Sequence, residues 1–202
     1  MKKIIAMLLA LFALTAFCSC GVSELLERAV SRGTTGESVY RNEKLNITFT
    51  KSDDMVFLTD EEIASLMNIS KDLMTNGDEI FEIAGLTSVT DFLAKNPVTG
   101  NNVALVFEDL VKTGNSTISE SQYLDASKRQ LSGQAGFNYT FGETSSVKLG
   151  GETYVKLDAQ ATYGGTRMHQ GFYVRKVGTY MVVITITTVD DTPLATYEAM
   201  FS

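Results

Sequence analysis

The last third of the chain places the strongest constraint on its fold, because it contains three long runs of β-forming residues joined by two-residue turns. In order, the runs and turns are 152–163, Gly164-Gly165, 166–176, Val177-Gly178 and 179–189. Two-residue turns join antiparallel strands and fix which residues lie opposite each other. This segment therefore predicts a three-stranded antiparallel meander with a defined register.

The predicted register gathers apolar side chains on one face of the meander. The expected neighbours on this face are Val155 and Val174, Leu157 and Phe172, Ala161 and Met168, Met181 and Val174, and Val183 and Phe172. The last strand also adds apolar residues to the opposite face, namely Tyr180, Val182, Ile184 and Ile186. A sheet that is apolar on one face and partly apolar on the other needs cover on both. We therefore predict an α+β fold, an antiparallel β-sheet with helices on both faces (an α/β/α sandwich).

Three helix starts and several further strands fit this architecture. Capping boxes are present at Thr59-Asp60-Glu61-Glu62 and Ser119-Glu120-Ser121-Gln122. A third helix is predicted after Thr192, with Pro193 at its first position. The first helix is expected to run from Ile63 to Met74 on one apolar face, and residues 76–86 predict a short helical segment. The further strands are predicted over 38–41, 45–50, 89–95, 103–110 and 137–142.

The first twenty residues are typical of a bacterial lipoprotein signal. Lys2 and Lys3 precede an apolar run that ends at Phe17-Cys18-Ser19-Cys20. This run is shorter than the roughly 20 apolar residues of a membrane-spanning helix, which indicates a cleaved export signal. Signal peptidases accept small residues before the cut, so Ser19 favours lipidation at Cys20 over Cys18. The remaining alternative is an ordinary secretory peptide that leaves a free thiol.

The signal divides the chain into three predicted parts. Residues 1–19 form the signal peptide, residues 20–37 form a lipidated cysteine and flexible tether, and residues 38–202 form a single globular domain. The tether prediction rests on the polar, Gly/Thr-rich segment up to Glu37, whose function would be spacing; the alternative is that Leu25 and Leu26 dock on the domain. These features predict a protein at the outer face of the bacterial cytoplasmic membrane, bound to membrane lipid through acylated Cys20.

Composition argues against several classes of function. Removal of Lys2 and Lys3 with the signal lowers the net charge from −7 to −9, which disfavours a nucleic-acid partner. With Cys20 acylated and Cys18 removed, the mature chain has no free thiol for catalysis or metal binding. Only one histidine, His169, is available for a catalytic triad or a zinc site. We expect no cofactor, no metal site and no catalytic residue.

The polar residues on one face of the meander are the candidate binding patch. They are Tyr154, Lys156, Asp158, His169, Tyr173 and Arg175. His169 is predicted to pair with Gln160 near Ile186, where a structural role is favoured over a general base, because no nucleophile accompanies it at motif spacing. The patch would bind an envelope protein or a small ligand.

Acidic pairs are a second group of candidates. Asp53-Asp54, Asp60-Glu61-Glu62 and Asp190-Asp191 could offer oxygen ligands to calcium, but no segment has the spacing of an EF-hand loop. Asp60 to Glu62 is better explained as favourable charge at a helix N-terminus. Two carboxyl groups in one cleft, one with a raised pKa, would instead predict a hydrolase acting on cell-wall or extracellular polymers.

Five short segments occur in a characteristic order between Tyr40 and Phe201. They are Tyr40-Arg41-Asn42-Glu43 before Leu45-Asn46-Ile47-Thr48-Phe49, Asp60-Glu61-Glu62-Ile63, Thr99-Gly100-Asn101-Asn102-Val103 before Val106-Phe107-Glu108, Gly150-Gly151 before Tyr154, and Tyr173-Val174-Arg175-Lys176-Val177-Gly178. In this order the chain resembles the PsbP-like family, and most of all its small bacterial lipoproteins. The resemblance implies an α/β/α sandwich with a non-enzymatic role in binding or assembly.

Together these observations predict a lipid-anchored extracytoplasmic binding or assembly protein that is not an enzyme. The alternatives are the carboxylate-dependent hydrolase and a small solute-binding lipoprotein. The latter is disfavoured because solute-binding proteins usually close two domains around the ligand, whereas residues 38–202 are expected to form one.

Overall fold

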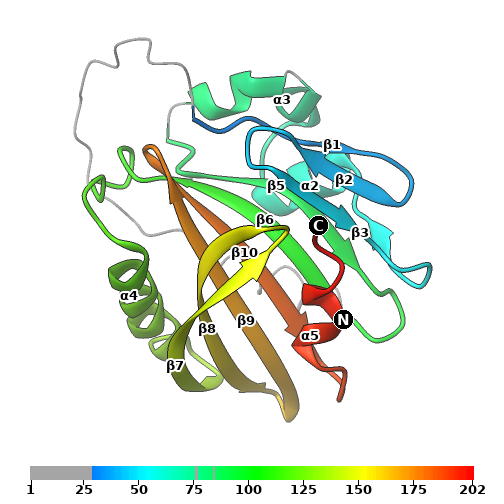
Figure 1. Ribbon diagram of the computed structural model, residues 1–202, viewed down its shortest axis with the longest axis vertical. Helices are drawn as coiled ribbons and strands as arrows, with labels where there is room; N and C mark the ends of the chain where they lie inside the picture. Colours follow the sequence, from blue (N-terminus) through cyan, green and yellow to red (C-terminus); the bar gives the residue numbers. More distant parts are fainter. Residues whose placement is uncertain (1–28, 76, 84) are drawn as a thin grey trace.

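The computed structural model describes residues 29–75, 77–83 and 85–202, and these form two antiparallel sheets flanked by helices (Figure 1). The larger sheet has seven strands in the order β4-β5-β6-β10-β9-β8-β7. Its strands are β4 (Val56–Phe57), β5 (Ser88–Lys95), β6 (Asn102–Asp109), β7 (Phe137–Leu149), β8 (Glu152–Tyr163), β9 (Thr166–Val177) and β10 (Tyr180–Thr188). The predicted strands of this sheet are all present, although the one predicted over 137–142 continues to Leu149.

The first hairpin of the meander has the predicted register, and the second is shifted by two residues. Val155 lies opposite Val174, as expected from a Gly164-Gly165 turn. In the second hairpin Val183, rather than Met181, lies opposite Val174. The turn there consists of residues 178 and 179, because Gly178 supplies the positive φ of 59° at its first position. Because side chains alternate between faces, a register shift of two residues keeps every side chain on its predicted face of the sheet. The predicted pairing of β9 with β10 was therefore wrong, whereas the predicted faces were correct.

The smaller sheet is formed by β1 (Thr34–Thr35), β2 (Val39–Asn42) and β3 (Ile47–Thr50), in that order. It contains the predicted pair of strands over 38–41 and 45–50. The end of the chain packs alongside β3, where the backbone N–H of Thr48 donates to Ser202 and that of Thr50 donates to Met200. The C-terminus is thus fixed beside the small sheet.

Both predicted capping boxes are formed. The helical segments are α2 (Asp60–Met67), α3 (Lys71–Thr75), the 3-10 helix η2 (Gly77–Glu82), α4 (Glu120–Ser132) and α5 (Leu194–Glu198). The single helix expected to continue to Met74 is broken at Asn68, whose φ of 56° ends α2 in the left-handed conformation. Pro193 is the N-cap of α5 rather than its first residue. Within the described residues, no helix is long and apolar enough to span a membrane.

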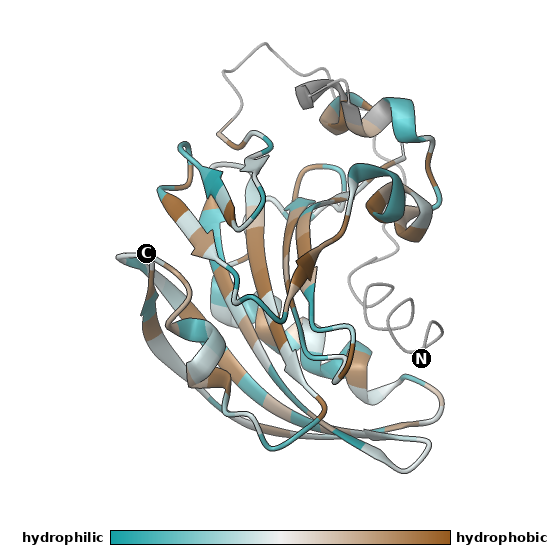
Figure 2. Ribbon diagram, turned by 90° about the vertical axis from the view of Figure 1, so that its right-hand side faces the viewer, coloured by the Kyte–Doolittle hydropathy of each residue, from teal (hydrophilic) through white to brown (hydrophobic). Residues whose placement is uncertain are grey.

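The core has a layer on each face of the larger sheet. Helix α4 covers one face, where its Tyr123, Leu124 and Leu131 pack on the sheet. The other face is covered by α2, α3, α5 and the small sheet. Figure 2 shows the hydrophobic stretches along the central strands between these layers. The predicted antiparallel sheet with helices on both faces is confirmed, with the small sheet as an additional part of one layer.

The described part of the predicted tether, residues 29–37, packs against the domain. Val30 is fully buried, and β1 pairs with β2. The folded part of the chain therefore begins by residue 29 rather than at 38. Leu25 and Leu26 lie outside the described residues.

Candidate functional site

The six residues of the predicted binding patch lie on one face of two neighbouring strands. They are Tyr154, Lys156 and Asp158 in β8, and His169, Tyr173 and Arg175 in β9. Side chains alternate between faces along a strand, and these residues are separated by even numbers of positions within each strand. The register places Lys156 opposite Tyr173. The fold therefore brings the six residues together, on the face that also carries α5 and the small sheet.

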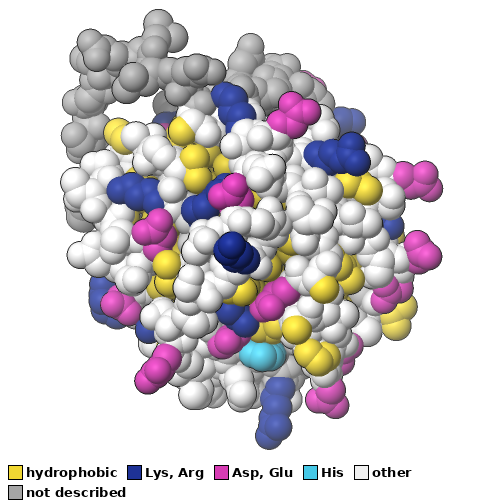
Figure 3. Space-filling view, viewed as in Figure 1, with side chains coloured by type: hydrophobic (Ala, Val, Ile, Leu, Met, Phe, Trp, Pro, Cys, Tyr) yellow, Lys and Arg dark blue, Asp and Glu magenta, His cyan; other side chains and the backbone are white. Residues whose placement is uncertain are grey.

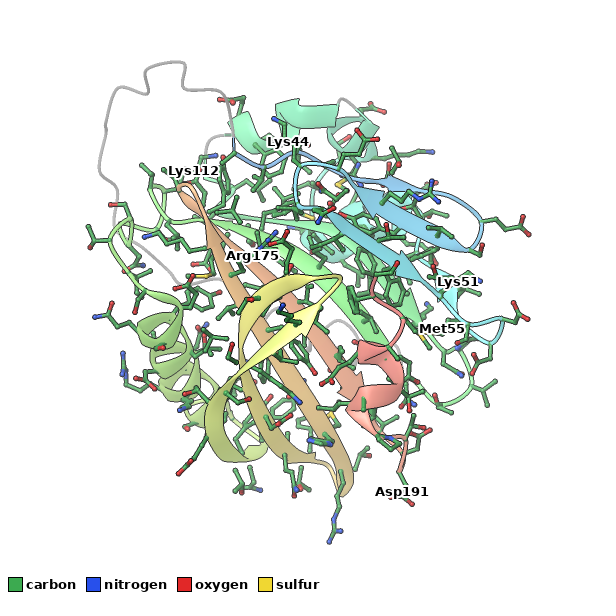
Figure 4. The ribbon with its side chains drawn as sticks, viewed as in Figure 1. Lys44, Lys51, Met55, Lys112, Arg175 and Asp191 are labelled. Atoms are coloured by element: carbon green, nitrogen blue, oxygen red, sulfur yellow. The ribbon has the colours of Figure 1, made fainter. Side chains whose placement is uncertain are left out.

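Tyr154 and Arg175 form the closed half of this patch. Nη2 of Arg175 donates to the carbonyl of Leu45 at 2.8 Å, and Nη1 is paired with Glu152. The guanidinium carbon lies 5.2 Å from the centroid of the Tyr154 ring, which is buried. Burial raises the pKa of Tyr154 to about 12. Arg175, labelled in Figure 4, joins β9 to the turn before β3 through these contacts, and its side chain is 16% exposed.

Lys156, Asp158 and His169 form the open half of the patch together with Glu198 of α5. Nζ of Lys156 lies 3.1 Å from Oδ1 of Asp158 and 2.9 Å from Oε1 of Glu198. Nε2 of His169 lies 3.7 Å from the same Asp158 oxygen. The side chains of Asp158 and His169 are 42% and 44% exposed. Figure 3 shows the histidine at the surface among charged side chains, so Asp158 and His169 are the accessible members of this half.

Tyr173 holds Glu198, a member of the open half, in place. It is fully buried, and its hydroxyl donates to Oε1 of Glu198 at 2.5 Å. Burial and then the bond to Glu198 raise the pKa of Tyr173 well above its usual value. Burial alone would raise the pKa of Glu198, but the bonds from Tyr173 and Lys156 outweigh it and lower that pKa. Glu198 and Lys156 are consequently both charged at neutral pH.

Gly171 makes this arrangement possible. It lies between His169 and Tyr173 on the same face of β9, opposite Asp158. A Cβ at this position would lie 2.6 Å from the Tyr173 hydroxyl oxygen. The ring of Tyr173 therefore lies across Gly171 to reach Glu198, which a larger residue would prevent.

The structural role favoured for His169 stays a prediction, because its surroundings were predicted only in part. Its predicted pairing with Gln160 is correct, but the shifted second hairpin places Thr188, not Ile186, beside it. The side chain is half exposed rather than enclosed. Glu198, in contrast, was missed, because nothing in the sequence indicates that α5 folds back over the sheet onto Lys156.

The carboxyl groups with a raised pKa lie elsewhere in the molecule. Burial raises the pKa of Glu108 to about 7 and also raises that of Asp91, and both side chains are enclosed in the interior. In the open half, the pKa of Glu198 is lowered instead. The raised carboxyl pKa values that the hydrolase alternative invokes are thus those of Glu108 and Asp91 in the interior, and that of Glu198 in the open half is shifted the opposite way.

Two of the acidic pairs meet at one end of the sheet. The side-chain amide of Asn96 donates to Asp54 at 2.7 Å, and that of Asn101 donates to Asp190 at 2.9 Å. Among the described residues, no group of three or more His, Cys, Asp or Glu side chains could hold a metal ion. The third group, Asp60 to Glu62, forms the first turn of α2 as predicted. Cys20 lies outside the described residues.

Comparison with known proteins gives similarities to solved structures, whereas no protein-family model and no curated protein matches the chain. The chain is similar to the solution structure of cyanobacterial PsbP (CyanoP) from Synechocystis, with 11% identity, a TM-score of 0.47, and coverage of 90% of this chain and 97% of that one. A Bacteroides thetaiotaomicron protein has 13% identity, a TM-score of 0.45, and coverage of 82% and 48%. LpqN, involved in cell envelope biogenesis of Mycobacterium tuberculosis, has 15% identity, a TM-score of 0.40, and coverage of 76% of each chain. The chain is thus similar to a PsbP protein along most of its length, as its sequence resemblance to the PsbP-like family predicts.

Proposed function

We propose that this protein is a lipid-anchored extracytoplasmic binding or assembly protein that uses the open half of its patch to hold an envelope protein or a small ligand. The observation that carries the proposal is that Asp158 and His169 are exposed and lie next to the buried Tyr173. Binding requires accessible polar groups in fixed positions. Tyr173, Glu198 and Lys156 supply that fixation through short contacts.

The proposed location rests on the N-terminal sequence. The basic residues, the apolar run and Ser19 before Cys20 support cleavage and acylation at that cysteine. Acylation would hold the mature domain at the outer face of the bacterial cytoplasmic membrane. A Cys20→Ser variant is expected to lose incorporation of labelled palmitate and to leave the membrane fraction, whereas Cys18→Ser is expected to keep both. Unchanged palmitate labelling of Cys20→Ser would contradict this assignment.

The binding proposal is tested by site-specific cross-linking in intact cells. A photo-reactive amino acid is placed at His169 in the open half and, as a control, at Asp125 on α4, which covers the opposite face of the sheet. An envelope partner that cross-links through His169 and not through Asp125 would support the assembly role. Recovery of the protein alone from both positions would contradict a protein partner and leave the small ligand to be tested.

Point variants separate binding from folding. Asp158→Ala should weaken capture of the partner, while Asp125→Ala should not, although the two side chains are 42% and 59% exposed and each lies beside a lysine. Replacement of Tyr173 or Arg175 is unsuitable, because Tyr173 is buried and Arg175 joins β9 to the Leu45 carbonyl. Equal capture by the Asp158→Ala and Asp125→Ala variants would show that the open half is not the binding surface.

A further inference from the structure

The segment that leads to the proposed anchor is fastened to the domain by a buried polar network. Nη2 of Arg32 lies 2.8 Å from Oδ1 of Asp60, and Nε lies 3.4 Å from Oδ1 of Asp91. Nη1 donates to the carbonyl of Met74 at 2.7 Å. The backbone N–H of Gly33 lies 3.1 and 3.0 Å from the two Asp91 oxygens. We call Arg32, Gly33, Asp60 and Asp91 the Arg32 clamp.

The clamp is built around one enclosed carboxylate. The Asp91 side chain is fully buried and also accepts from the hydroxyl of Tyr40 and the side-chain amide of Asn42. Burial raises the pKa of Asp91 even though these donors and Arg32 act against it. A buried charge is tolerated only when it is paired and hydrogen-bonded. The segment around Arg32 therefore completes the interior and is not a loosely attached tail.

Gly33 permits the close approach on which the clamp depends. A Cβ at this position would lie 2.5 Å from the Arg41 carbonyl oxygen and 2.5 Å from the Tyr40 ring. No side chain fits between this backbone and β2. Gly36, four residues from Arg32 and in the same segment, has more room, since a Cβ there would lie 3.4 Å from the Val39 carbonyl oxygen.

The clamp fixes the position of Ala29, the first residue that the structure describes. A Cβ at Gly178 would lie 2.7 Å from the Cβ of Ala29, so the described chain begins beside the turn between β9 and β10. His169 lies eight residues before Val177, the last residue of β9, which corresponds to roughly 26 Å along the strand. The open half of the patch and Ala29 are therefore at opposite ends of β9.

Docking of the segment also limits how far Cys20 can lie from the domain. From Cys20 to Ala29 the chain can reach roughly 30 Å at most, whereas a free tether from Cys20 to Ser38 could reach roughly 60 Å. The longer tether would leave from the other side of the small sheet, where the carbonyl of Ser38 accepts from the N–H of Lys51. Figure 4 shows Lys51 far from Lys112, which lies at the anchor end.

We infer that the Arg32 clamp orients the anchored domain, with the β9–β10 turn toward the lipid bilayer and the open half of the patch directed away from it. This inference rests on the lipid anchor proposed above. It follows that the partner or ligand of the open half approaches from the side away from the membrane, and that membrane lipid is not that ligand.

Two exposed valines at opposite ends of β6 provide a matched pair of test positions. Val111 is 57% exposed and follows Leu110, whose N–H donates to Thr179 in the β9–β10 turn. Val98 is 85% exposed in the turn at the other end of β6. Because the chain contains no tryptophan, Val111→Trp and Val98→Trp each introduce a single fluorophore.

The experiment measures energy transfer from each tryptophan to dansyl headgroups in phosphatidylethanolamine/phosphatidylglycerol vesicles carrying the full-length, lipidated protein. Transfer should be several-fold greater from Val111→Trp than from Val98→Trp. In a Gly33→Ala background this difference should shrink, while Gly36→Ala should leave it unchanged. Arg32→Gln, which removes the charge without a steric clash, should act like Gly33→Ala and serves as a second variant.

The possible outcomes separate this inference from the proposed function. Equal transfer from both positions on membrane-bound protein would overturn the orientation while leaving the anchor intact, and greater transfer from Val98→Trp would reverse it. Failure of the lipidated protein to bind vesicles, with Cys20→Ser behaving identically, would overturn the anchor and the inference together. An unchanged difference in both clamp variants would show that the clamp does not set the orientation.

Discussion

Glu108 should make the domain less stable as the pH rises from about 4.5 to about 7. This residue is in β6, is fully buried beneath α4, and accepts a hydrogen bond from the Tyr123 hydroxyl at 2.6 Å. Its other carboxyl oxygen has no hydrogen-bond partner among the described residues. Burial is the main effect and raises the pKa from 4.5 to about 7, although the bond from Tyr123 acts in the opposite direction.

The magnitude follows from the difference between the folded and unfolded pKa. The folded state favours the protonated carboxyl, so its stabilising contribution is fully present below the unfolded value of 4.5 and is lost by the time the pH exceeds about 7. Each pKa unit corresponds to about 1.4 kcal/mol, which gives a loss of about 3 kcal/mol in the free energy of unfolding. Glu108→Gln resembles the protonated form, so it should match wild type near pH 4.5 and exceed its stability at pH 8.

Urea unfolding of wild type and Glu108→Gln between pH 4.5 and 8 measures this difference. Other ionisable groups are common to both proteins, so their effects largely cancel in the difference. Glu143→Gln, on an exposed position of β7, is the control and should show no such trend. A difference that stays constant with pH, or a wild type that gains stability relative to Glu108→Gln as the pH rises, would refute the reasoning.

Three further substitutions test contacts elsewhere in the fold. Gly171→Ala should cost about 1–3 kcal/mol, because its Cβ would lie 2.6 Å from the Tyr173 hydroxyl; urea unfolding should show a smaller cost in a Tyr173→Phe background, and an equal cost would contradict the clash. Lys112→Met removes the donor to the Phe81 carbonyl at 2.7 Å and should cost about 1–3 kcal/mol; hydrogen exchange should rise over 77–83, and unchanged protection there would contradict this role. Thr59→Ala should cost about 1 kcal/mol by removing the α2 cap, while Thr59→Ser should retain most of it in thermal unfolding.

Local patterns predicted those parts of the fold in which neighbouring residues determine the structure. Alternation and the Gly164-Gly165 turn gave the register of the first hairpin, because two glycines with positive φ accept only a few turn geometries. The second hairpin contains one glycine, Gly178, which can begin or end a two-residue turn. The sequence pattern does not distinguish these alternatives, and the observed turn begins there.

The open half of the patch was predicted only in part for a related reason. Even spacing within each strand was enough to place Lys156, Asp158 and His169 on one face. Which of the patch residues are accessible depends on where α5 and the small sheet pack. Arg175 is enclosed by the carbonyl of Leu45, a contact between residues 130 positions apart, and periodicity carries no signal of such a contact.

The N-terminal segment shows why composition alone misassigns a polar stretch. Glycine, threonine and charge usually indicate a solvated linker, because such residues bury little apolar surface. Here Asp91, 58 positions beyond Gly33, supplies a buried carboxylate that the segment's own N–H group and Arg32 satisfy. The polar groups of the segment are therefore the reason that it docks. If this pairing is disrupted, the same residues should become the flexible tether that their composition predicts, and the domain should lose the orientation that we infer for it at the membrane.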